Sequence, residues 1–182
     1  MPASEEAFQA GRAEETPRLD DALDSRASDG VISSFAGVCL IAAMFGRNLH
    51  HLHRPDADDN DEDLNSEFWK RHRTLDNTLL TTVLSFPATL KLPQGLSNPN
   101  TVFCNLMIHT AAICLHQAAI FKADKNRSGT QVSSESKRRC IIAAEQITNI
   151  MRMITTLDLT LVCPYLSLVV HGSAVKLLSR LT

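Results

Sequence analysis

The sequence predicts an all-α fold, an irregular bundle of about five helices around a buried central helix. The main observation is an uncharged, apolar stretch that ends at Lys122, the first charged residue after Lys91. A helix that is apolar on nearly every side must be covered by neighbours. The second observation is that apolar residues recur every three or four positions in the flanking segments, whereas no alternating strand pattern is sustained.

The N-terminal segment has a different composition. Residues 1–29 contain eight acidic side chains, three arginines and few large apolar groups. Such a segment buries too little apolar surface to offset the entropy lost on ordering, so a disordered acidic tail is expected. Residues 30–182 are expected to form one domain. Because 44% of the whole chain is hydrophobic, that domain can bury a sizeable core.

Two amphipathic helices are predicted before the central stretch, over residues 33–53 and 66–86. Their apolar faces comprise Phe35, Val38, Ala42, Phe45, Leu49 and Leu52 in the first helix, and Phe68, His72, Leu75, Leu79, Val83 and Phe86 in the second. The segment between them is acidic and begins with Pro55. After the second helix, Pro87 and Pro93 predict an extended connector over residues 86–93.

The central helix is expected to begin at Asn98, which can cap it, with Pro99 at the first helical position. Residues 123–134 then predict a polar linker. A fourth helix is expected over 136–156, with an apolar stripe made of Cys140, Ala144, Ile147, Met151 and Ile154. A break over 157–163 follows, and Pro164 is expected to open a fifth helix.

Composition excludes several classes of protein. The formal net charge is -2, so no general basic excess marks a nucleic-acid-binding surface. The five cysteines include no C-x-x-C pair, which indicates reduced, buried thiols in an intracellular protein. No secretory signal pattern is present. Of three uncharged stretches, two are short for a membrane span and the central one carries polar side chains that are costly in lipid, so no membrane partner is expected.

The acidic segment has part of a calcium-loop pattern. Asp56, Asp58, Asn60 and Glu67 occupy positions one, three, five and twelve of such a loop, where oxygen ligands would surround a hard cation. However, Asp61 stands where the sharp turn needs glycine. A solvated, charged linker is therefore the preferred interpretation.

The histidines raise a second metal hypothesis. His50 and His53 share a helical face, and a nearby aspartate would complete a transition-metal site. Together with His51 they also form a cation cluster at a helix C-terminus beside an acidic segment, which needs no metal. In the central helix, His109 and His116 lie on one side, and the preferred interpretation is that they are core histidines with one hydrogen-bond partner each.

No catalytic pattern is present. The sequence lacks a glycine-rich phosphate loop, a nucleophile elbow and a metalloprotease helix motif. Three basic residues, 137–139, precede Cys140 and would tend to lower its pKa, but no histidine base can be assigned to it and a buried stripe position explains it better. We therefore expect no enzyme, and no catalytic, cofactor-binding or metal-ligating residue is assigned.

The order of several local phrases resembles one known family. The phrases are Phe-Gly-Arg-Asn-Leu-His-His-Leu-His-Arg-Pro at 45–55, Phe-Trp-Lys-Arg-His-Arg-Thr-Leu-Asp-Asn-Thr-Leu at 68–79, Phe-Pro-Ala-Thr-Leu-Lys-Leu-Pro at 86–93, Leu-His-Gln-Ala-Ala-Ile-Phe at 115–121, and Ser-Lys-Arg-Arg-Cys-Ile-Ile-Ala-Ala-Glu-Gln-Ile at 136–147. Their order and spacing are similar to those of the regulatory middle region of fungal-specific binuclear zinc-cluster transcription factors. The resemblance covers residues 33–178.

The resemblance implies an all-α fold and a role in RNA polymerase II transcription in the nucleus. In that family a zinc cluster N-terminal to this region reads DNA, but no C-x₂-C-x₆-C pattern occurs here. Zinc is therefore expected only in a missing N-terminal cluster, and DNA contact only through a segment absent here. The family's middle region also extends further at both ends, so a truncated product, a fragment or a stand-alone regulator is expected.

Taken together, the sequence predicts a non-catalytic regulatory domain of a fungal transcription factor, with residues 30–182 forming part of that domain. Protein partners, self-association or a small metabolite would act on it. The alternative is a small helical metal-binding protein or enzyme that uses His50, His53 and the acidic loop.

Overall fold

The computed structural model describes residues 1–24, 32–54, 63–126 and 130–155, and within them it contains only helices and connecting segments. The helices, in chain order, are α1 (Glu5–Gln9), α2 (Leu19–Leu23), α3 (Ser34–His53), α4 (Glu67–Ser85), the short 3-10 helix η1 (Ala88–Leu90), α5 (Pro99–Asn126) and α6 (Thr130–Ile154). No strand occurs in the described residues. The prediction of an all-α fold is therefore confirmed.

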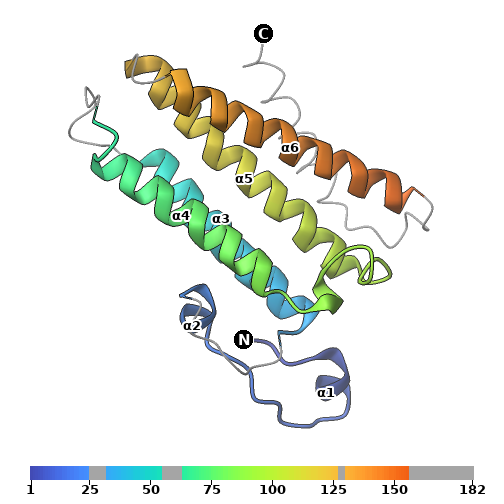
Figure 1. Cartoon of the computed structure of the whole chain (residues 1–182). Coiled ribbons are helices and arrows are strands. Elements are labelled where there is room, and N and C mark those ends of the chain that lie inside the picture. The colour runs from blue at the N-terminus through green and yellow to red at the C-terminus, as the bar shows by residue number, and fades with distance from the viewer. Residues whose placement is uncertain (25–31, 55–62, 127–129, 156–182) are drawn as a thin grey trace.

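The other three long helices, α3, α4 and α6, pack against α5. Figure 1 shows α3 and α5 running in one direction while α4 and α6 run in the other. Helix α5 packs against α6 on one side and against α3 and α4 on the other. This arrangement confirms the predicted central helix. Helices α1 and α2 lie near the end of the bundle where α3 begins (Figure 1).

Three groups of buried apolar side chains hold these helices together. The largest lies between α3, α4 and α5 and includes Leu40, Leu79 and Met107. A second lies between α5 and α6, where the aliphatic stripe of α6 packs against Val102, Leu106 and Ile113 of α5; its α6 members are Ala143, Ile147, Ile150 and Ile154. The third is much smaller and joins the start of α4 to the end of α5.

The helix starts follow the expected capping chemistry in two of three cases. The Ser33 hydroxyl accepts a hydrogen bond from the Ala36 backbone N–H at the start of α3 (3.1 Å). The Asn98 side chain accepts one from the Asn100 N–H just before α5 (3.0 Å). In contrast, Ser66 makes no side-chain capping bond to α4. The start of α4 is therefore the least secured of these three ends.

The N-terminal segment differs from the expected disordered tail. Residues 1–24 form α1 and α2, and the remainder of the tail, residues 25–29, lies outside the described residues. Some apolar groups of this segment are buried, since Ala7 is covered and Leu23 packs into the largest core, although Phe8 is exposed. The Met1 amino group also donates to the Pro17 carbonyl (2.7 Å), which ties the segment to itself. These contacts order the segment, and its amino-acid composition alone does not indicate them.

The predicted linker over residues 123–134 is also wrong at both ends. Helix α5 continues to Asn126 and α6 begins at Thr130. Ala123 is buried against the start of α4, which extends α5 beyond its apolar stretch. On the other side of the turn, the Ser133 hydroxyl donates to Asp124 Oδ1 (2.9 Å). Polar residues of this range thus belong to α5 and α6, and the Ser133 side chain is buried.

The connector over residues 86–93 is partly helical, because η1 forms within the predicted extended segment. Phe86 and Leu90 are both buried in the largest core, and the 3-10 turn brings them to the same side. The predicted break over 157–163 and the fifth helix from Pro164 lie outside the described residues.

Helix α5 is long and apolar enough to cross a membrane by length and composition alone. However, 56% of its most apolar window is buried by other parts of the protein, as is typical of a core helix. Its position between α3, α4 and α6 accounts for its composition without a membrane.

Candidate functional site

Three buried imidazoles from three helices meet at one end of the bundle, and we call His51, His72 and His116 the histidine cluster. His51 lies in the last turn of α3, His72 in α4 and His116 in α5. The ring centroids of His51 and His72 are 6.1 Å apart, and those of His72 and His116 are 5.4 Å apart. His72 is therefore the central member of the cluster.

Aromatic side chains from the first turn of α4 enclose the cluster. The Phe68 ring lies 4.7 Å from His51 and 6.2 Å from His72, measured between centroids. Trp69 meets His72 edge-on at 5.8 Å. The Lys122 ammonium group of α5 sits 5.5 Å above the Phe68 ring, a cation–π distance. These rings exclude solvent from the imidazoles.

Asp76 is the acid beside the cluster, and it connects three helices. His116 Nε2 lies 3.4 Å from Asp76 Oδ1, while Arg139 Nη1 of α6 lies 2.6 Å from Asp76 Oδ2. Arg139 is held in turn by Glu135, one helical turn earlier, with its Nε 3.2 Å from Glu135 Oε1. A polar chain thus runs from α5 through α4 to α6.

Burial decides the protonation of the cluster. Loss of solvent lowers the pKa of His72 to about 3, and the neighbouring His116 and His51 push it in the same direction. Burial alone would raise the pKa of Asp76, but the hydrogen bond from His116 and the nearby positive charges outweigh it, so the pKa of Asp76 is lowered. His72 is therefore neutral and Asp76 ionised at neutral pH.

Several buried polar atoms at this site have no hydrogen-bond partner within the described part of the chain. They are Trp69 Nε1, His72 Nδ1, His116 Nδ1 and the neighbouring Gln117 Nε2. Each such atom costs about 1–3 kcal/mol in a folded protein. These unsatisfied polar atoms lower the stability of the fold. Their retention at one place makes the histidine cluster the strongest candidate for a functional site in the described residues.

The predicted metal residues are not brought together. His50 and His53 are exposed on α3, whereas His51 turns inward to the histidine cluster. Within residues 1–24, 32–54, 63–126 and 130–155, no group of three or more histidine, cysteine or acidic side chains has an arrangement that could hold a metal ion. The candidate calcium ligands Asp56, Asp58 and Asn60 lie outside these ranges.

The two histidines of the central helix have different surroundings. His116 belongs to the cluster, as described above. His109 is half-buried and its pKa is lowered by burial alone. The sequence places His72 on an apolar helix face and Trp69 three residues earlier, and that Trp-x-x-His spacing is the signal that could have located the site. No signal indicated that His51 would join them.

The expectation of buried cysteines holds for Cys104 and Cys140, whereas Cys39 and Cys114 are only half-buried and Cys163 lies outside the described residues. Cys140 is buried on the inner face of α6, and burial together with nearby Cys114 raises its pKa to about 11. Two of the basic residues before Cys140, Arg138 and Arg139, form ion pairs with Glu135. Cys140 is consequently a poor nucleophile.

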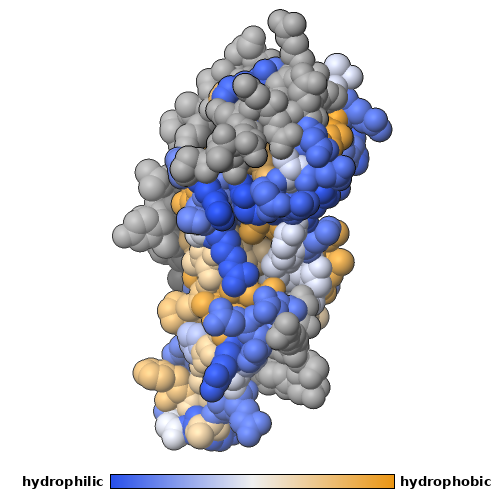
Figure 2. Space-filling model, turned by 90° about the vertical axis from the view of Figure 1, so that its left-hand side faces the viewer, coloured by the Kyte–Doolittle hydropathy of each residue, from blue (hydrophilic) through white to orange (hydrophobic). Residues whose placement is uncertain are grey.

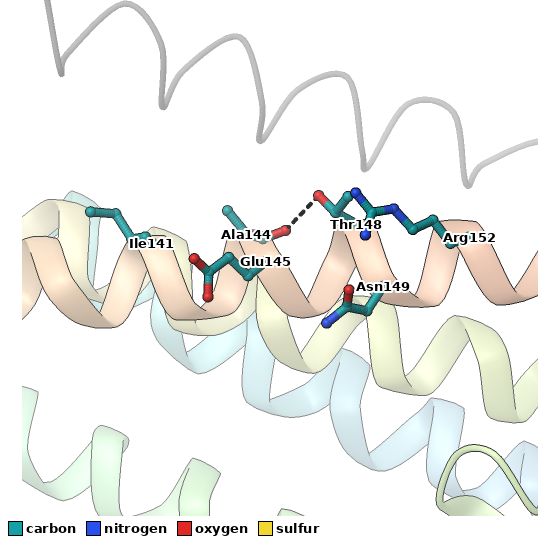
Figure 3. A pocket seen from close by; sticks show the side chains of 6 residues that line it. All are labelled: Ile141, Ala144, Glu145, Thr148, Asn149 and Arg152. Atoms are coloured by element: carbon teal, nitrogen blue, oxygen red, sulfur yellow. Dashed lines mark hydrogen bonds between the residues drawn. The ribbon is translucent and has the colours of Figure 1, made fainter.

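A pocket lies along α6 (Figure 3). Six side chains of this one helix line it, namely Ile141, Ala144, Glu145, Thr148, Asn149 and Arg152. The Thr148 hydroxyl donates to the Ala144 carbonyl (3.0 Å). Among the described residues that line it, apolar Ile141 and Ala144 lie beside polar side chains.

Comparison with known proteins gives one informative result. The chain is 23% identical over 168 residues to the pigment biosynthesis transcriptional activator pigB of Monascus ruber. The match covers 92% of this chain and 30% of the length of that relative. No protein-family model matches the chain, and no solved structure matches it. The chain is thus distantly similar to a fungal transcriptional activator and spans less than a third of its length.

Proposed function

We propose that this chain is a non-catalytic regulatory domain of a fungal transcription factor that acts on RNA polymerase II transcription in the nucleus. The observation that carries the proposal is the similarity to a transcriptional activator, which extends over 92% of the chain. Under this proposal, the role of the helical body is one of interaction.

The finer assignment is to the middle region of the zinc-cluster family. It is supported by the local phrases quoted above, two of which meet in space: the Trp-x-x-His phrase of α4 and the Leu-His phrase of α5 both contribute to the histidine cluster. Under this proposal, DNA is read by a zinc-binding segment outside these 182 residues. Residues 30–182 then act as part of the regulatory domain.

Exposed apolar side chains support contacts with a protein partner or a second copy. On α4, Leu80 and Leu84 lie one turn apart and are 56% and 67% exposed. Phe35 of α3 and Phe121 of α5 are also mostly exposed. Figure 2 shows hydrophobic surface between hydrophilic regions on one face of the molecule. Exposed apolar side chains of this kind favour binding, because a partner that covers them removes apolar surface from water.

A tethering experiment tests the function. The full chain is fused to an unrelated DNA-binding domain in a fungal cell that carries a reporter gene under the matching operator. We expect the fusion to change reporter transcription several-fold relative to the DNA-binding domain alone. Leu106→Asp places a charge in the core between α5 and α6 and should abolish the effect. A fusion that is nuclear and folded but leaves the reporter unchanged contradicts the proposal.

A paired surface experiment tests the contact face. Leu80→Glu with Leu84→Glu should reduce the reporter effect without loss of helical content, because both side chains are exposed. Thr81→Glu, an exposed change on the same helix, is the matched control and should leave the effect intact. Equal effects of both variants would show that general surface charge, and not this face, determines the output.

A further inference from the structure

We propose that the outer face of α6 is the docking surface for residues 164–181 of the same chain, which lie outside the described residues. This segment would run antiparallel to α6 along Ile141, Ala144 and Thr148. The inference rests on the surface of α6 and on the sequence that follows it, and it does not depend on the proposed function in transcription.

Helix α6 has apolar side chains on its outer side as well as on the side that packs against α5. The inner stripe, which includes Ile147 and Ile150, is buried. On the outer side, Ile141 is 48% exposed and Ala144 is half-buried. Figure 3 shows Ile141, Ala144 and Thr148 on the side of α6 that faces away from α5. A helix with apolar side chains on two sides is typical of one that has neighbours on both.

The polar side chains of this face are compatible with an apolar neighbour. The Thr148 hydroxyl donates to the Ala144 carbonyl (3.0 Å), so its hydrogen bond is made within α6 and no unpaired donor would be buried. Glu145 and Arg152, which also line the pocket, are both exposed, so their charged groups remain in water. The pocket between these side chains therefore fits a second helix that lies alongside α6.

The sequence after α6 has the composition of such a helix. The charged residues of the segment 157–182 are Asp158, Lys176 and Arg180. After Pro164, apolar residues recur every three or four positions, and this stripe comprises Leu166, Val170, Ala174, Leu177 and Leu181. Most of the stability of a helix in a protein comes from packing of its apolar face, so this segment needs an apolar neighbour.

The length of the connection favours α6 as that neighbour. Eight residues, 156–163, lie between the described end of the chain's last helix and Pro164. Connections of about 2–8 residues are usual in helix bundles, and short ones join antiparallel neighbours. At a rise of about 1.5 Å per residue, the predicted stripe is about 22 Å long, enough to cover the roughly 17 Å between Ile141 and Arg152.

The tether also favours this segment over a second copy of the protein. A segment joined to its docking surface by a short connection is present there at an effective concentration in the millimolar range. The outer face of α6 would then be covered within the chain. Leu80 and Leu84 of α4, which lie across α5 from α6, would remain exposed for a partner.

Photo-crosslinking of the 182-residue chain tests the docking directly. A benzophenone amino acid replaces Thr148 in the pocket or, as a matched control, Gln146, which is also exposed but is not among the described residues that line the pocket. Mass spectrometry of the peptides should find crosslinks to residues 164–181 several-fold more often from position 148 than from position 146. A mixture of unlabelled and nitrogen-15-labelled chains shows whether each crosslink lies within one chain.

Crosslinks from position 148 to residues 164–181 of the same chain support the proposal. Crosslinks between chains would show that a second copy covers this face, and they would overturn it. The proposal is also wrong if position 148 yields no crosslink to the segment, or if position 146 reaches it equally often.

Hydrogen exchange of the full chain provides a second test. In the wild type, we expect the amides of residues 164–181 to exchange at least about tenfold more slowly than in an unstructured peptide. Ile141→Asp places a charge in the docking surface and should remove most of this protection. Ile142→Asp is the matched control and should retain it, because Ile142 is similarly exposed, at 41%, and is not among the described residues that line the pocket.

Amides in the middle of α5 show whether the body of each variant is folded, and they should stay protected in both. An unprotected segment in the wild type contradicts the docking, and so does an equal loss of protection in the two variants. If Ile141→Asp does not fold, the crosslinking experiment still decides the question.

Discussion

Arg139 Nη1 of α6 lies 2.6 Å from Asp76 Oδ2 of α4, and the same carboxylate has His116 of α5 3.4 Å from its other oxygen. Asp76 thus bridges two helices that flank it and neutralises charge beside the histidine cluster. The ion pair links α4 with a helix on the far side of α5, so its removal should loosen the arrangement of the bundle at this end.

Asp76→Asn is expected to lower the free energy of unfolding by about 1–3 kcal/mol, because it removes the charge that pairs with both His116 and Arg139. Arg139→Gln should cost less, about 0.5–1 kcal/mol, since the Arg139 side chain is 43% exposed and water screens its half of the pair. Urea denaturation at neutral pH measures both. Arg138→Gln is the control, because Arg138 pairs only within α6, and a cost as large as that of Asp76→Asn would contradict the bridging role.

Acid should destabilise the protein before its carboxylates protonate. The pKa of His72 is about 3 in the folded protein and 6.5 when unfolded, so the unfolded state binds more protons between these values. The contribution of a neutral His72 to the free energy of unfolding is therefore fully present above pH 6.5. It falls by about 1.4 kcal/mol for each pH unit below that value. Denaturant unfolding at a series of pH values measures the slope.

Asp76 acts in a lower pH range and in the same direction. Its folded pKa is below the ordinary 3.8, so the stability that it contributes is present above that value and is lost below it. In His72→Phe the loss of stability near pH 6 should be smaller, whereas the loss below pH 4 should persist. A wild-type stability that does not change between about pH 6.5 and pH 5 would contradict the burial of a neutral His72.

The helix ranges could be predicted because apolar residues recur periodically, but the inner face of α3 was predicted wrongly, since Phe35, Ala42 and Leu49 are exposed. The buried apolar side chains of α3 include Leu40, Ile41 and Met44 instead. The predicted range 33–53 agrees with α3 (Ser34–His53), and the predicted range 66–86 agrees with α4 (Glu67–Ser85). The linker range 123–134 was predicted wrongly where polar residues belong to the end of α5 and the start of α6. Asp124 and Ser133 bond to each other across the turn between α5 and α6, and a window of composition cannot distinguish such residues from a linker.

The candidate site was less predictable because it depends on pairing between helices. His72 and His116 were each placed on an inward face, but their 5.4 Å approach follows from how α4 and α5 pack. His51 was grouped with His50 and His53 at a helix end, and only the rotation of α3 turns it inward. Spacing along one helix indicates which residues share a face, but not which faces meet.

The cysteines should react with thiol reagents at very different rates. Burial raises the pKa of Cys104 to about 12 and that of Cys140 to about 11, whereas Cys39 and Cys114 are only half-buried. At about pH 8, roughly one Cys104 in ten thousand is a thiolate. Labelling of the native chain, located by mass spectrometry, should therefore find Cys104 and Cys140 protected. Labelling in denaturant is the control, and equal native rates for Cys39 and Cys104 would contradict the packing.

The metal hypothesis leads to a prediction of no tight binding. His50 and His53 are exposed, and the described residues do not bring a third ligand to them. Isothermal titration with zinc and with calcium is expected to show no stoichiometric, tight site. If zinc does bind with one-to-one stoichiometry, a chain with His50→Gln and His53→Gln tests whether these residues hold it. Loss of binding in that variant would favour the metal-protein alternative over the regulatory domain.

Two glycines of α3 should respond in opposite ways to alanine. A Cβ at Gly37 would lie 3.1 Å from Leu90 Cδ1 and 3.3 Å from Cys104 Sγ, and both neighbours are buried in the core. Because they have little room to move, Gly37→Ala should destabilise the fold by about 1–2 kcal/mol despite the better helix propensity of alanine. Gly46→Ala meets nothing within 4 Å and should stabilise by about 0.5–1 kcal/mol. Thermal or urea unfolding compares the two variants. If both stabilise the protein equally, α3 and α5 are not as closely packed at Gly37 as the structure shows, because the added methyl group would then find space.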